Sequence, residues 1–257
     1  MQDLQQGQAT RLDIACVKLG LCESRNKAQS LIKKGKVCVN HQVCKKPSYE
    51  VLASDSLLLL DSLCFVSRAG EKLYYFLESH PDLIQDFGIL NALDIGASTG
   101  GFSEVLLEAG VQSIVCVDVG SNQLHARLRN NPRVRFYENT DIRLYAKQIN
   151  QESQTFPLVV CDVSFISLKD ILEAIKTLAA GLVILLFKPQ FEVGIEAKRN
   201  KKGVLMESQS IMRALESTLA LLEEEQFKIL VCEESKVKGK EGNVEFFIAC
   251  QRIKLGA

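Results

Sequence analysis

The stretch Leu93-Asp94-Ile95-Gly96-Ala97-Ser98-Thr99-Gly100-Gly101-Phe102 decides the fold of this chain of 257 residues. It reads as a strand, a glycine-rich turn and the start of a helix, a geometry in which the backbone approaches a nucleotide-like ligand closely. Glycine lacks a Cβ and adopts positive φ, so it lets the ligand come near and lets the chain turn sharply. The next apolar run ends at Asp118, where a carboxylate can accept hydrogen bonds from ribose hydroxyls.

The residues within this loop narrow the kind of ligand. The loop does not match the dinucleotide pattern G-x-G-x-x-G, and the chain has no phosphate-binding G-x-x-x-x-G-K-[ST]. The Asp94 carboxylate is poorly suited to an anionic pyrophosphate and well suited to a ligand with a cationic end. This indicates S-adenosylmethionine, whose sulfonium and ammonium groups are both positive.

The region around this loop alternates strand-like and helical patterns, which predicts an α/β fold with a parallel sheet covered by helices on both faces. A long helix over 208–226 and two last strands, 227–232 and 245–250, suit the antiparallel hairpin that ends many Rossmann-like methyltransferase sheets. The other predicted strands are 91–95, 113–118, 133–138, 157–161 and 181–187. The other predicted helices are 101–109, 121–128, 141–149 and 167–179.

Composition excludes several classes of protein. Apolar residues make up 47% of the chain, yet no apolar run is long enough to span a membrane, and no targeting segment is visible. The nine cysteines form no C-x-x-C pair and only three histidines accompany them, so we expect no metal site. The thiols are expected to be reduced core residues of a cytoplasmic, monomeric protein; examples are Cys116, Cys161, Cys232 and Cys250.

A net charge of zero conceals an asymmetry along the chain. Residues 11–50 contain nine basic and three acidic residues, so the remainder is acidic. Helical spacing predicts two short helices in this region, with Ser24 as N-cap and Gly35 as a stop, followed by a hairpin turn at Asn40-His41. A basic module fused to an acidic one suggests that the first holds a polyanion, although a solvated lysine-rich surface is an equally good interpretation of the charge alone.

The motifs of this first module resemble the S4 RNA-binding domain, in which two helices and a hairpin grip structured RNA. The similar residues run over about forty positions: Arg11-Leu12-Asp13, Gly20-Leu21, Ser24-Arg25, Ala28, Leu31-Ile32, Gly35, Val37, Val39-Asn40 and Lys46-Pro47-Ser48. The departure is His41, where the family usually has glycine. The resemblance implies an RNA-binding domain over residues 10–64. The RNA-binding candidates of the chain are Arg11, Arg25, Lys33, Lys34, Lys36, Lys45, Lys46 and Arg68.

Polar residues end four apolar runs of the second module: Asp94, Asp118, Asp162 and Lys188. In an open α/β sheet, ligands bind outside the carboxyl ends of the strands, so these residues are expected to meet at one site. A lysine after five apolar residues is costly to bury without a partner. The pattern suggests methyl transfer to a hydroxyl, in which a lysine removes the proton or stabilises the alkoxide. The residues leave both roles open, because a carboxylate and a second lysine would shift the pKa of Lys188 in opposite directions.

Longer motifs of this module resemble the TlyA (hemolysin A) family of ribosomal RNA methyltransferases, whose catalytic half is FtsJ-like. The motifs are Ser67-Arg68-Ala69-Gly70-x-Lys72-Leu73, the loop from Asp94 to Phe102, Asp162-Val163-Ser164-Phe165-Ile166-Ser167-Leu168, Lys188-Pro189-Gln190-Phe191-Glu192 and Gly242-Asn243-Val244-Glu245-Phe246-Phe247. One departure is Ala69, where glycine is usual. The resemblance implies an FtsJ-like domain over residues 65–257 and ribose 2′-O-methylation of cytidine in ribosomal RNA or ribosomal subunits.

Site residues follow from the same resemblance. The FtsJ-like Lys-Asp-Lys-Glu tetrad falls on Lys72, Asp162, Lys188 and Glu245. An aspartate that contacts the adenine amino group falls on Asp141. The expected contacts of S-adenosylmethionine are therefore Asp94, Gly96, Ala97, Ser98, Thr99, Gly100, Gly101, Phe102, Asp118 and Asp141.

Two other functions compete with this hypothesis. The older family name suggests a cytolysin, but the chain shows no strongly amphipathic basic helix. A catalytically silent RNA-binding assembly factor is the second alternative, and the filled tetrad positions argue against it. The basic stretch 198–203 could contact RNA near the active site, or it could be a solvated loop.

Overall fold

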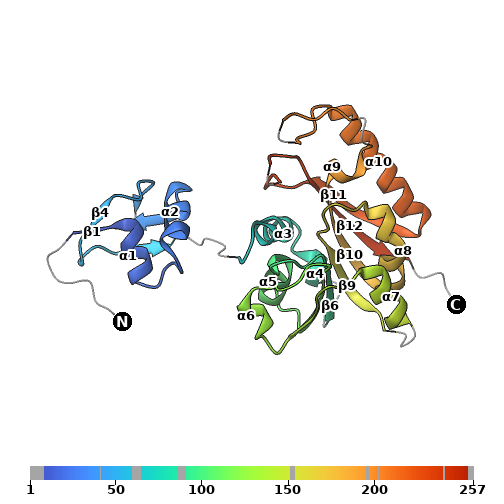
Figure 1. Ribbon diagram of the computed structural model, residues 1–257, viewed down its shortest axis with the longest axis horizontal. Coiled ribbons are helices and arrows are strands. Elements are labelled where there is room, and N and C mark those ends of the chain that lie inside the picture. The colour runs from blue at the N-terminus through green and yellow to red at the C-terminus, as the bar shows by residue number, and fades with distance from the viewer. Residues whose placement is uncertain are drawn as a thin grey trace. The chain divides into compact units, whose positions relative to one another are not determined.

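The computed structural model describes residues 9–40, 42–59, 65–85, 91–150, 154–194, 197–201, 203–239 and 241–253. The chain divides into two compact units, Met1–Cys64 and Phe65–Ala257 (Figure 1). The junction expected near residues 62–67 lies largely outside the described residues, as does His41 of the predicted hairpin turn.

The N-terminal unit contains two helices, a short strand pair and a small sheet. Helix α1 (Leu12–Lys18) and helix α2 (Arg25–Lys33) pack together, and β1 (Thr10–Arg11) pairs antiparallel with β4 (Glu50–Val51). The three-stranded sheet has the order β3-β2-β5; its strands are β2 (Val37–Val39), β3 (Gln42–Val43) and β5 (Leu57–Leu59). As predicted, the Ser24 side chain caps α2 by accepting a bond from the Lys27 amide at 3.3 Å.

The larger unit is built on a seven-stranded sheet of order β11-β12-β10-β9-β6-β7-β8. Only β12 runs against its neighbours, because it pairs antiparallel with both β10 and β11 while the other described pairs are parallel. The predicted α/β fold and the antiparallel last pair of strands are thus confirmed. The strands are β6 (Asn91–Ile95), β7 (Ser113–Val117), β8 (Val134–Tyr137), β9 (Phe156–Cys161), β10 (Ala179–Phe187), β11 (Phe227–Glu234) and β12 (Phe246–Arg252).

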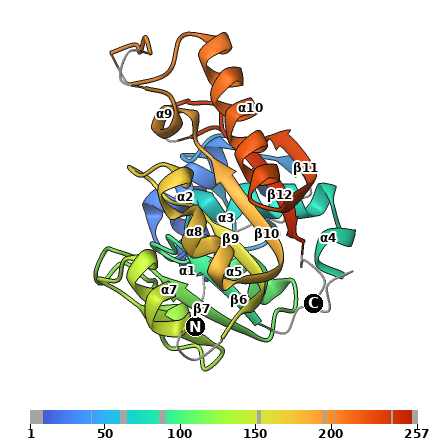
Figure 2. The same ribbon diagram turned by 90° about the vertical axis from the view of Figure 1, so that its right-hand side faces the viewer.

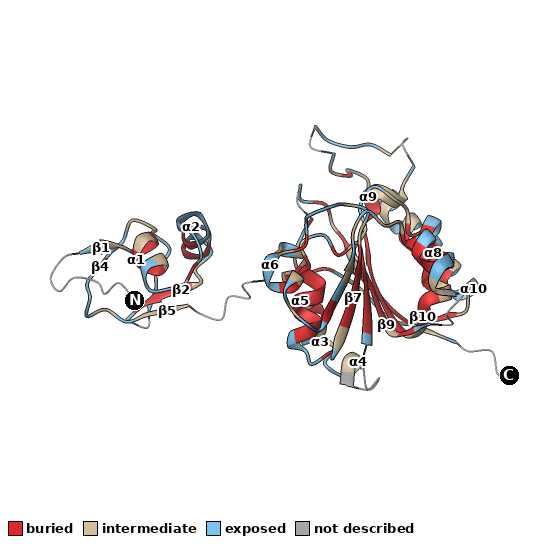
Figure 3. Cartoon of the chain, turned by 60° about the horizontal axis from the view of Figure 1, so that its bottom comes forward, coloured by how far each residue is buried: buried red, intermediate tan, exposed pale blue. Residues whose placement is uncertain are grey.

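Helices cover both faces of this sheet, and the strands between them are the most buried part of the unit (Figure 3). One face packs on α7 (Ile142–Asn150), α8 (Leu168–Leu178) and α10 (Ser208–Glu224). The opposite face packs on α3 (Arg68–Ser79) and α5 (Gly101–Glu108), where the Phe247 ring contacts Phe76 and Phe102. Short helices complete the unit: α4 (Asp82–Gln85), α6 (Ala126–Arg129) and α9 (Pro189–Glu192).

The chain between α9 and α10 extends beyond the carboxyl ends of the strands (Figure 2). It carries the described part of the basic stretch, and Arg199 and Leu205 form an antiparallel bridge across it. The Asn243 side chain anchors this excursion, because its Oδ1 accepts a bond from the Leu205 amide at 3.0 Å. Lys202 of the basic stretch lies outside the described residues.

Two local predictions were wrong. The helix expected over 121–128 is instead a loop followed by α6. The Glu138 carboxylate accepts hydrogen bonds from backbone amides of this loop, including Gln123 N–H at 3.1 Å, and these amides are therefore not used in a helix. Cys232 was expected in the core but is exposed, because β11 is an edge strand of the sheet. Cys116, Cys161 and Cys250 are buried as predicted, and burial raises the pKa of each thiol.

Candidate active site

Two adjoining cavities open at the carboxyl ends of the parallel strands, where ligands of such sheets bind. The first has a volume of about 310 Å³ and is lined by Asp94, Asp162 and Lys188 among others. The second has a volume of about 420 Å³ and is lined by Asp118 and Asp141. Both cavities include Gly96, Ser98, Asp162 and Ser164 in their walls. We call the first the reaction cavity and the second the nucleoside cavity.

The four tetrad positions form two ion pairs at the reaction cavity. Lys72 Nζ on α3 lies 2.6 Å from Glu245 Oε2, which directly precedes β12. Lys188 Nζ, at the end of β10, lies 2.6 Å from Asp162 Oδ1, at the end of β9. Both lysines are 8% exposed and both line the cavity. Each buried ammonium thus has the carboxylate partner that its desolvation requires.

Ser164 is a site residue that the sequence patterns did not single out. Its Oγ accepts a hydrogen bond from Lys188 Nζ at 2.8 Å, so Lys188 is held by Asp162 and Ser164 together. Ser164 also lines both cavities. Its position two residues after a strand-end aspartate was the available signal, because such a residue returns to the same edge of the sheet.

Asp94 is fully buried at the end of β6 and lines the reaction cavity. Its Oδ2 accepts bonds from the Ser103 amide at 3.0 Å and from Ser103 Oγ at 2.6 Å. Within the described part of the chain, its Oδ1 has no hydrogen-bond partner. Burial without a neighbouring cation raises the pKa of Asp94 to about 7. A ligand with a positive group at this oxygen would supply the missing partner.

Three glycines of the loop allow close packing of the backbone around the cavities. Gly96 has a φ of +78°, and a Cβ there would lie 2.8 Å from the carbonyl oxygen of Asp162, so this glycine lets two strand ends meet under the cavities. Gly100 (φ +92°) faces Leu128, and Gly101 faces Ser67 and Gly70 of the α3 region. Gly100 and Gly101 pack against neighbouring helices and are not in the walls of these two cavities, and their contact with the cofactor stays a prediction.

The other predicted contacts of the cofactor lie around the cavities. The reaction cavity includes Ala97, Thr99 and Phe102 in its wall. In the nucleoside cavity, the Asp118 carboxylate accepts bonds from the Ser98 and Gly120 amides at 2.8 and 2.7 Å, which ties the glycine loop to the end of β7.

Asp141 lies at the far side of the nucleoside cavity, before α7. Arg143 binds it through Nη2 at 2.6 Å, and this contact lowers the pKa of the Asp141 carboxyl. Phe165 stands at the rim of the same cavity with 91% of its surface exposed, and its ring contacts Phe191 at a centroid distance of 5.2 Å.

The predicted RNA-binding residues fall into three groups. Arg11 and Arg25 converge on Asp13 in the N-terminal unit. The predicted RNA-binding lysines of that unit lie on its surface, exposed except for the half-buried Lys36. They are Lys33, Lys34, Lys36, Lys45 and Lys46. Arg68 belongs to the larger unit, where it lines the reaction cavity and donates to the Lys238 carbonyl at 2.9 Å.

Two absences are limited to the described ranges. No helix there is long and apolar enough to cross a membrane. In the same ranges, no three histidine, cysteine, aspartate or glutamate side chains gather as a set of metal ligands.

Fold and site together define a class of protein. The family model described as FtsJ-like methyltransferase matches residues 65–252, and the model described as S4 domain matches residues 10–57. The chain is therefore an FtsJ-like methyltransferase that carries an S4 domain.

Within that class, the chain belongs to the TlyA family. It is 42% identical over 246 residues to the 23S rRNA (cytidine-2′-O)-methyltransferase TlyA of Campylobacter jejuni, an alignment that covers 87% of this chain and 92% of that protein. It is 36% identical over 243 residues to the 16S/23S rRNA (cytidine-2′-O)-methyltransferase TlyA of Mycobacterium tuberculosis, with coverages of 93% and 88%. A solved structure of a hemolysin-named protein from Streptococcus thermophilus superposes with a TM-score of 0.68 at 33% identity, covering 96% of this chain and 89% of that one. The family predicted from the motifs is confirmed.

Proposed function

We propose that this enzyme transfers a methyl group from S-adenosylmethionine to the ribose 2′-hydroxyl of a cytidine in ribosomal RNA. The observation that carries the proposal is the convergence of two lysine–carboxylate ion pairs in one cavity beside the glycine loop. The names of the Campylobacter and Mycobacterium relatives support the choice of ribosomal RNA and cytidine.

The residues around the two cavities fit S-adenosylmethionine. Asp94 offers a buried carboxylate oxygen that has no hydrogen-bond partner among the described residues, which suits the ammonium group of the cofactor's methionine part. Asp118 and Asp141 line the nucleoside cavity and would hold the ribose and the adenine. The cofactor supplies a methyl group that is already activated by a positive sulfur.

The chain's own residues would prepare the acceptor hydroxyl. Lys72 and Lys188 are fixed by their carboxylate partners, so their ammonium groups can donate hydrogen bonds to the acceptor oxygen while the proton of the hydroxyl passes to solvent water. Preorganised donors of this kind stabilise developing negative charge better than water does, because they need no reorientation. Asp162 and Glu245 then act as positioning residues.

The S4 domain is the part of the chain that we assign to holding the RNA. Its exposed lysines and its two arginines can neutralise phosphates, a contribution that falls steeply with added salt. The same proposal includes a monomeric enzyme that acts in the cytoplasm, where ribosomal RNA is found.

The product of the reaction tests the proposal. The purified protein is incubated with bacterial small and large ribosomal subunits that lack the modification and with tritiated S-adenosylmethionine, and the labelled nucleotides are mapped. We expect label on the 2′-oxygen of a cytidine ribose. Label on bases, or no label beside an active control methyltransferase, would overturn the assignment; in the second case, retained binding of subunits would indicate the silent assembly factor.

A lysine variant tests the site itself. Lys188→Ala should lower the rate of transfer by about 10²–10³-fold, the usual cost of removing one donor to a developing oxyanion, and should leave cofactor affinity nearly unchanged. Lys228→Ala removes an exposed lysine of β11 and is the matched control, expected to retain full activity. A large loss of cofactor affinity in Lys188→Ala would contradict the assigned role.

A further inference from the structure

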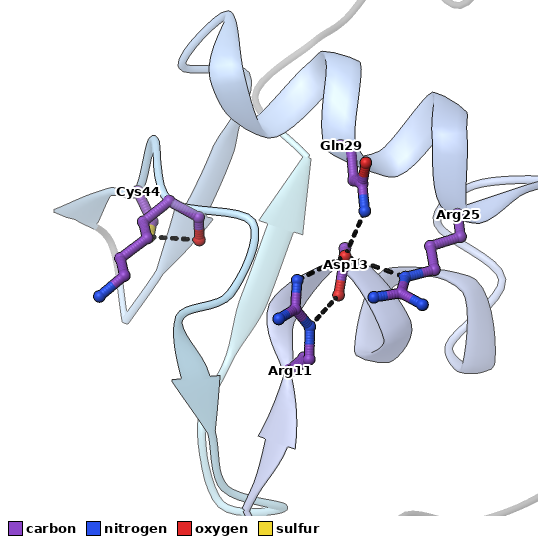
Figure 4. A network of polar contacts seen from close by, with 6 residues as sticks. Arg11, Asp13, Arg25, Gln29 and Cys44 are labelled. Atoms are coloured by element: carbon purple, nitrogen blue, oxygen red, sulfur yellow. Dashed lines mark hydrogen bonds and ion pairs between the residues drawn. The ribbon is translucent and has the colours of Figure 1, made fainter.

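A buried carboxylate lies at the centre of the N-terminal unit. The Asp13 side chain, on the first turn of α1, is 0% exposed. Figure 4 shows three side chains converging on it from β1 and α2. Arg11 donates to both carboxylate oxygens through Nε and Nη2 at 3.0 Å each, Arg25 donates through Nε at 3.0 Å, and Gln29 donates at 2.6 Å.

The two arginines remain accessible although their partner is not. The side chains of Arg11 and Arg25 are 41% and 53% exposed. A guanidinium has five N–H donors in a fixed fork. Asp13 engages two nitrogens of Arg11 and one of Arg25, so each arginine keeps donors directed elsewhere.

The contacts with Asp13 restrict the side-chain rotamers of Arg11 and Arg25 before RNA binds. The binding of RNA then does not have to immobilise these two side chains. A long cationic side chain loses rotamer freedom when it is immobilised at an interface, and this loss weakens binding. Arg11 and Arg25 are already fixed by a carboxylate that is held in the core beside Leu12 and Cys16, both fully buried. The two guanidinium groups are thus set at a constant separation before any ligand arrives.

We propose that Asp13 is a positioning residue that holds Arg11 and Arg25 as a preformed site for an RNA backbone phosphate. The inference rests on the proposed function, because it presumes that the S4 domain binds ribosomal RNA. It adds that an acidic residue strengthens the binding of a polyanion. A count of charges alone predicts the opposite effect on RNA affinity. Removing the negative charge of Asp13 would make the basic unit more positive and would strengthen the binding of RNA.

The two interpretations predict opposite changes in RNA affinity when the charge of Asp13 is removed, so this change tests the proposal. Asp13→Asn in the full chain keeps the size of the side chain, but its amide NH₂ cannot accept the bonds that the carboxylate accepts. Binding to bacterial large and small ribosomal subunits is measured at several salt concentrations. We expect about tenfold weaker binding and a slope of log K against log salt that is smaller by about 1. Glu23→Gln makes the same charge change at an exposed position of the same unit and should bind as well as the wild type or slightly better.

A second variant covers the case in which Asp13→Asn unfolds the N-terminal unit. Arg25→Lys keeps the charge but loses the fork, so it should also weaken binding and reduce the salt slope. The double variant should lose no more affinity than the larger of the two single losses, because both changes break the same contact. Affinity for S-adenosylmethionine should be the same in all variants, since the cofactor residues belong to the other unit.

The outcomes separate the two proposals. If Asp13→Asn is folded and binds as tightly as Glu23→Gln, or if Arg25→Lys retains wild-type affinity and salt slope, the positioning role is wrong while the methyltransferase function stands. If the wild-type protein binds neither subunit at low salt, the proposed RNA partner is wrong and the inference fails with it.

Discussion

Asp13 of the S4 domain and Asp94 of the methyltransferase unit are both fully buried, yet their surroundings are opposite. Asp13 accepts bonds from two arginines and a glutamine, and these contacts hold the pKa of its carboxyl well below the usual range. Among the described residues, Asp94 accepts hydrogen bonds through Oδ2 from Ser103 alone, and burial raises its pKa to about 7. The cation that compensates Asp13 belongs to the protein, whereas no described cation compensates Asp94.

This difference separates a carboxylate that organises the protein from one that is available to a ligand. A buried charge without a partner costs free energy, which a protein recovers when a ligand of opposite charge binds. Asp13 is satisfied before RNA binds and acts through its arginines. Asp94 is left incomplete, and we expect the ammonium of the cofactor to complete it.

The largest expected effect concerns the affinity of the cofactor. Asp94→Asn should weaken the binding of S-adenosylmethionine by about 100-fold, because a hydrogen bond between charged groups contributes about 1.5–3 kcal/mol. Calorimetric titration measures it. 5′-Methylthioadenosine, which lacks the ammonium, is the control ligand and should bind wild type and variant equally. Equal losses for both ligands would show that Asp94 supports the cavity rather than the ammonium.

A smaller effect is expected on the pH dependence of the same affinity. Asp94 must lose its proton to bind an ammonium, and its pKa is near 7. Affinity for S-adenosylmethionine should therefore fall about tenfold between pH 8 and pH 6, as the ionised fraction falls. Titrations with Asp94→Asn should show no such fall. A wild-type affinity that is constant over this range would contradict the role of the unpartnered carboxylate.

The smallest expected effect concerns stability without ligand. The folded-state pKa of Asp94 lies above its ordinary value of 3.8, so the native state binds more protons and the free energy of unfolding decreases as pH rises from about 4 to 7. The stability advantage of Asp94→Asn over the wild type should therefore grow by about 0.8 kcal/mol between pH 6.5 and pH 8, as Asp94 ionises in the native state. Urea unfolding followed by tyrosine fluorescence measures this, because four of the five tyrosines lie in the larger unit.

Asp13 should behave in the opposite way when the stability of the N-terminal unit is measured by amide hydrogen exchange in that unit. Its folded-state pKa is lowered, so its contribution to stability is present above pH 4 and is lost as the pH falls below that value. Asp13→Asn should therefore be less stable than the wild type at both pH 5 and pH 8. A stabilised Asp13→Asn at pH 8 would remove the contrast between the two carboxylates.

The sequence allowed the order of strands and helices to be predicted, because the runs of the parallel sheet are strongly apolar. It also placed Asp94, Asp162 and Lys188 at one edge, since parallel strands bring their carboxyl ends together. Lys72 and Glu245 were assigned to the site only through the resemblance to the TlyA family. Lys72 and Glu245 are separated by 173 residues, and their contact depends on how α3 and β12 pack, which periodicity does not encode.

Asp13 and Gly101 each have tertiary neighbours that the sequence patterns did not reveal. Asp13 counted as one of three acids that reduce a basic charge, and only its burial makes it the centre of a network. Gly101 was expected to contact the cofactor, and the structure adds a second reason for glycine there, because a Cβ would collide with Ser67 Oγ at the start of α3. In both cases the structural role of the residue depends on a neighbour that is distant in the sequence. The local sequence pattern does not predict which residue that neighbour is.

The position of β12 has a consequence for how the enzyme becomes active during synthesis. This strand follows β11 in the sequence but inserts between β10 and β11 in the sheet. Glu245 directly precedes it. We expect that a growing chain can form the glycine loop and the nucleoside cavity before Glu245 is available to pair with Lys72. A chain that stops before residue 245 would lack both the strand and the ion pair, so the ability to capture the cofactor and the ability to use it would arise at different moments of translation.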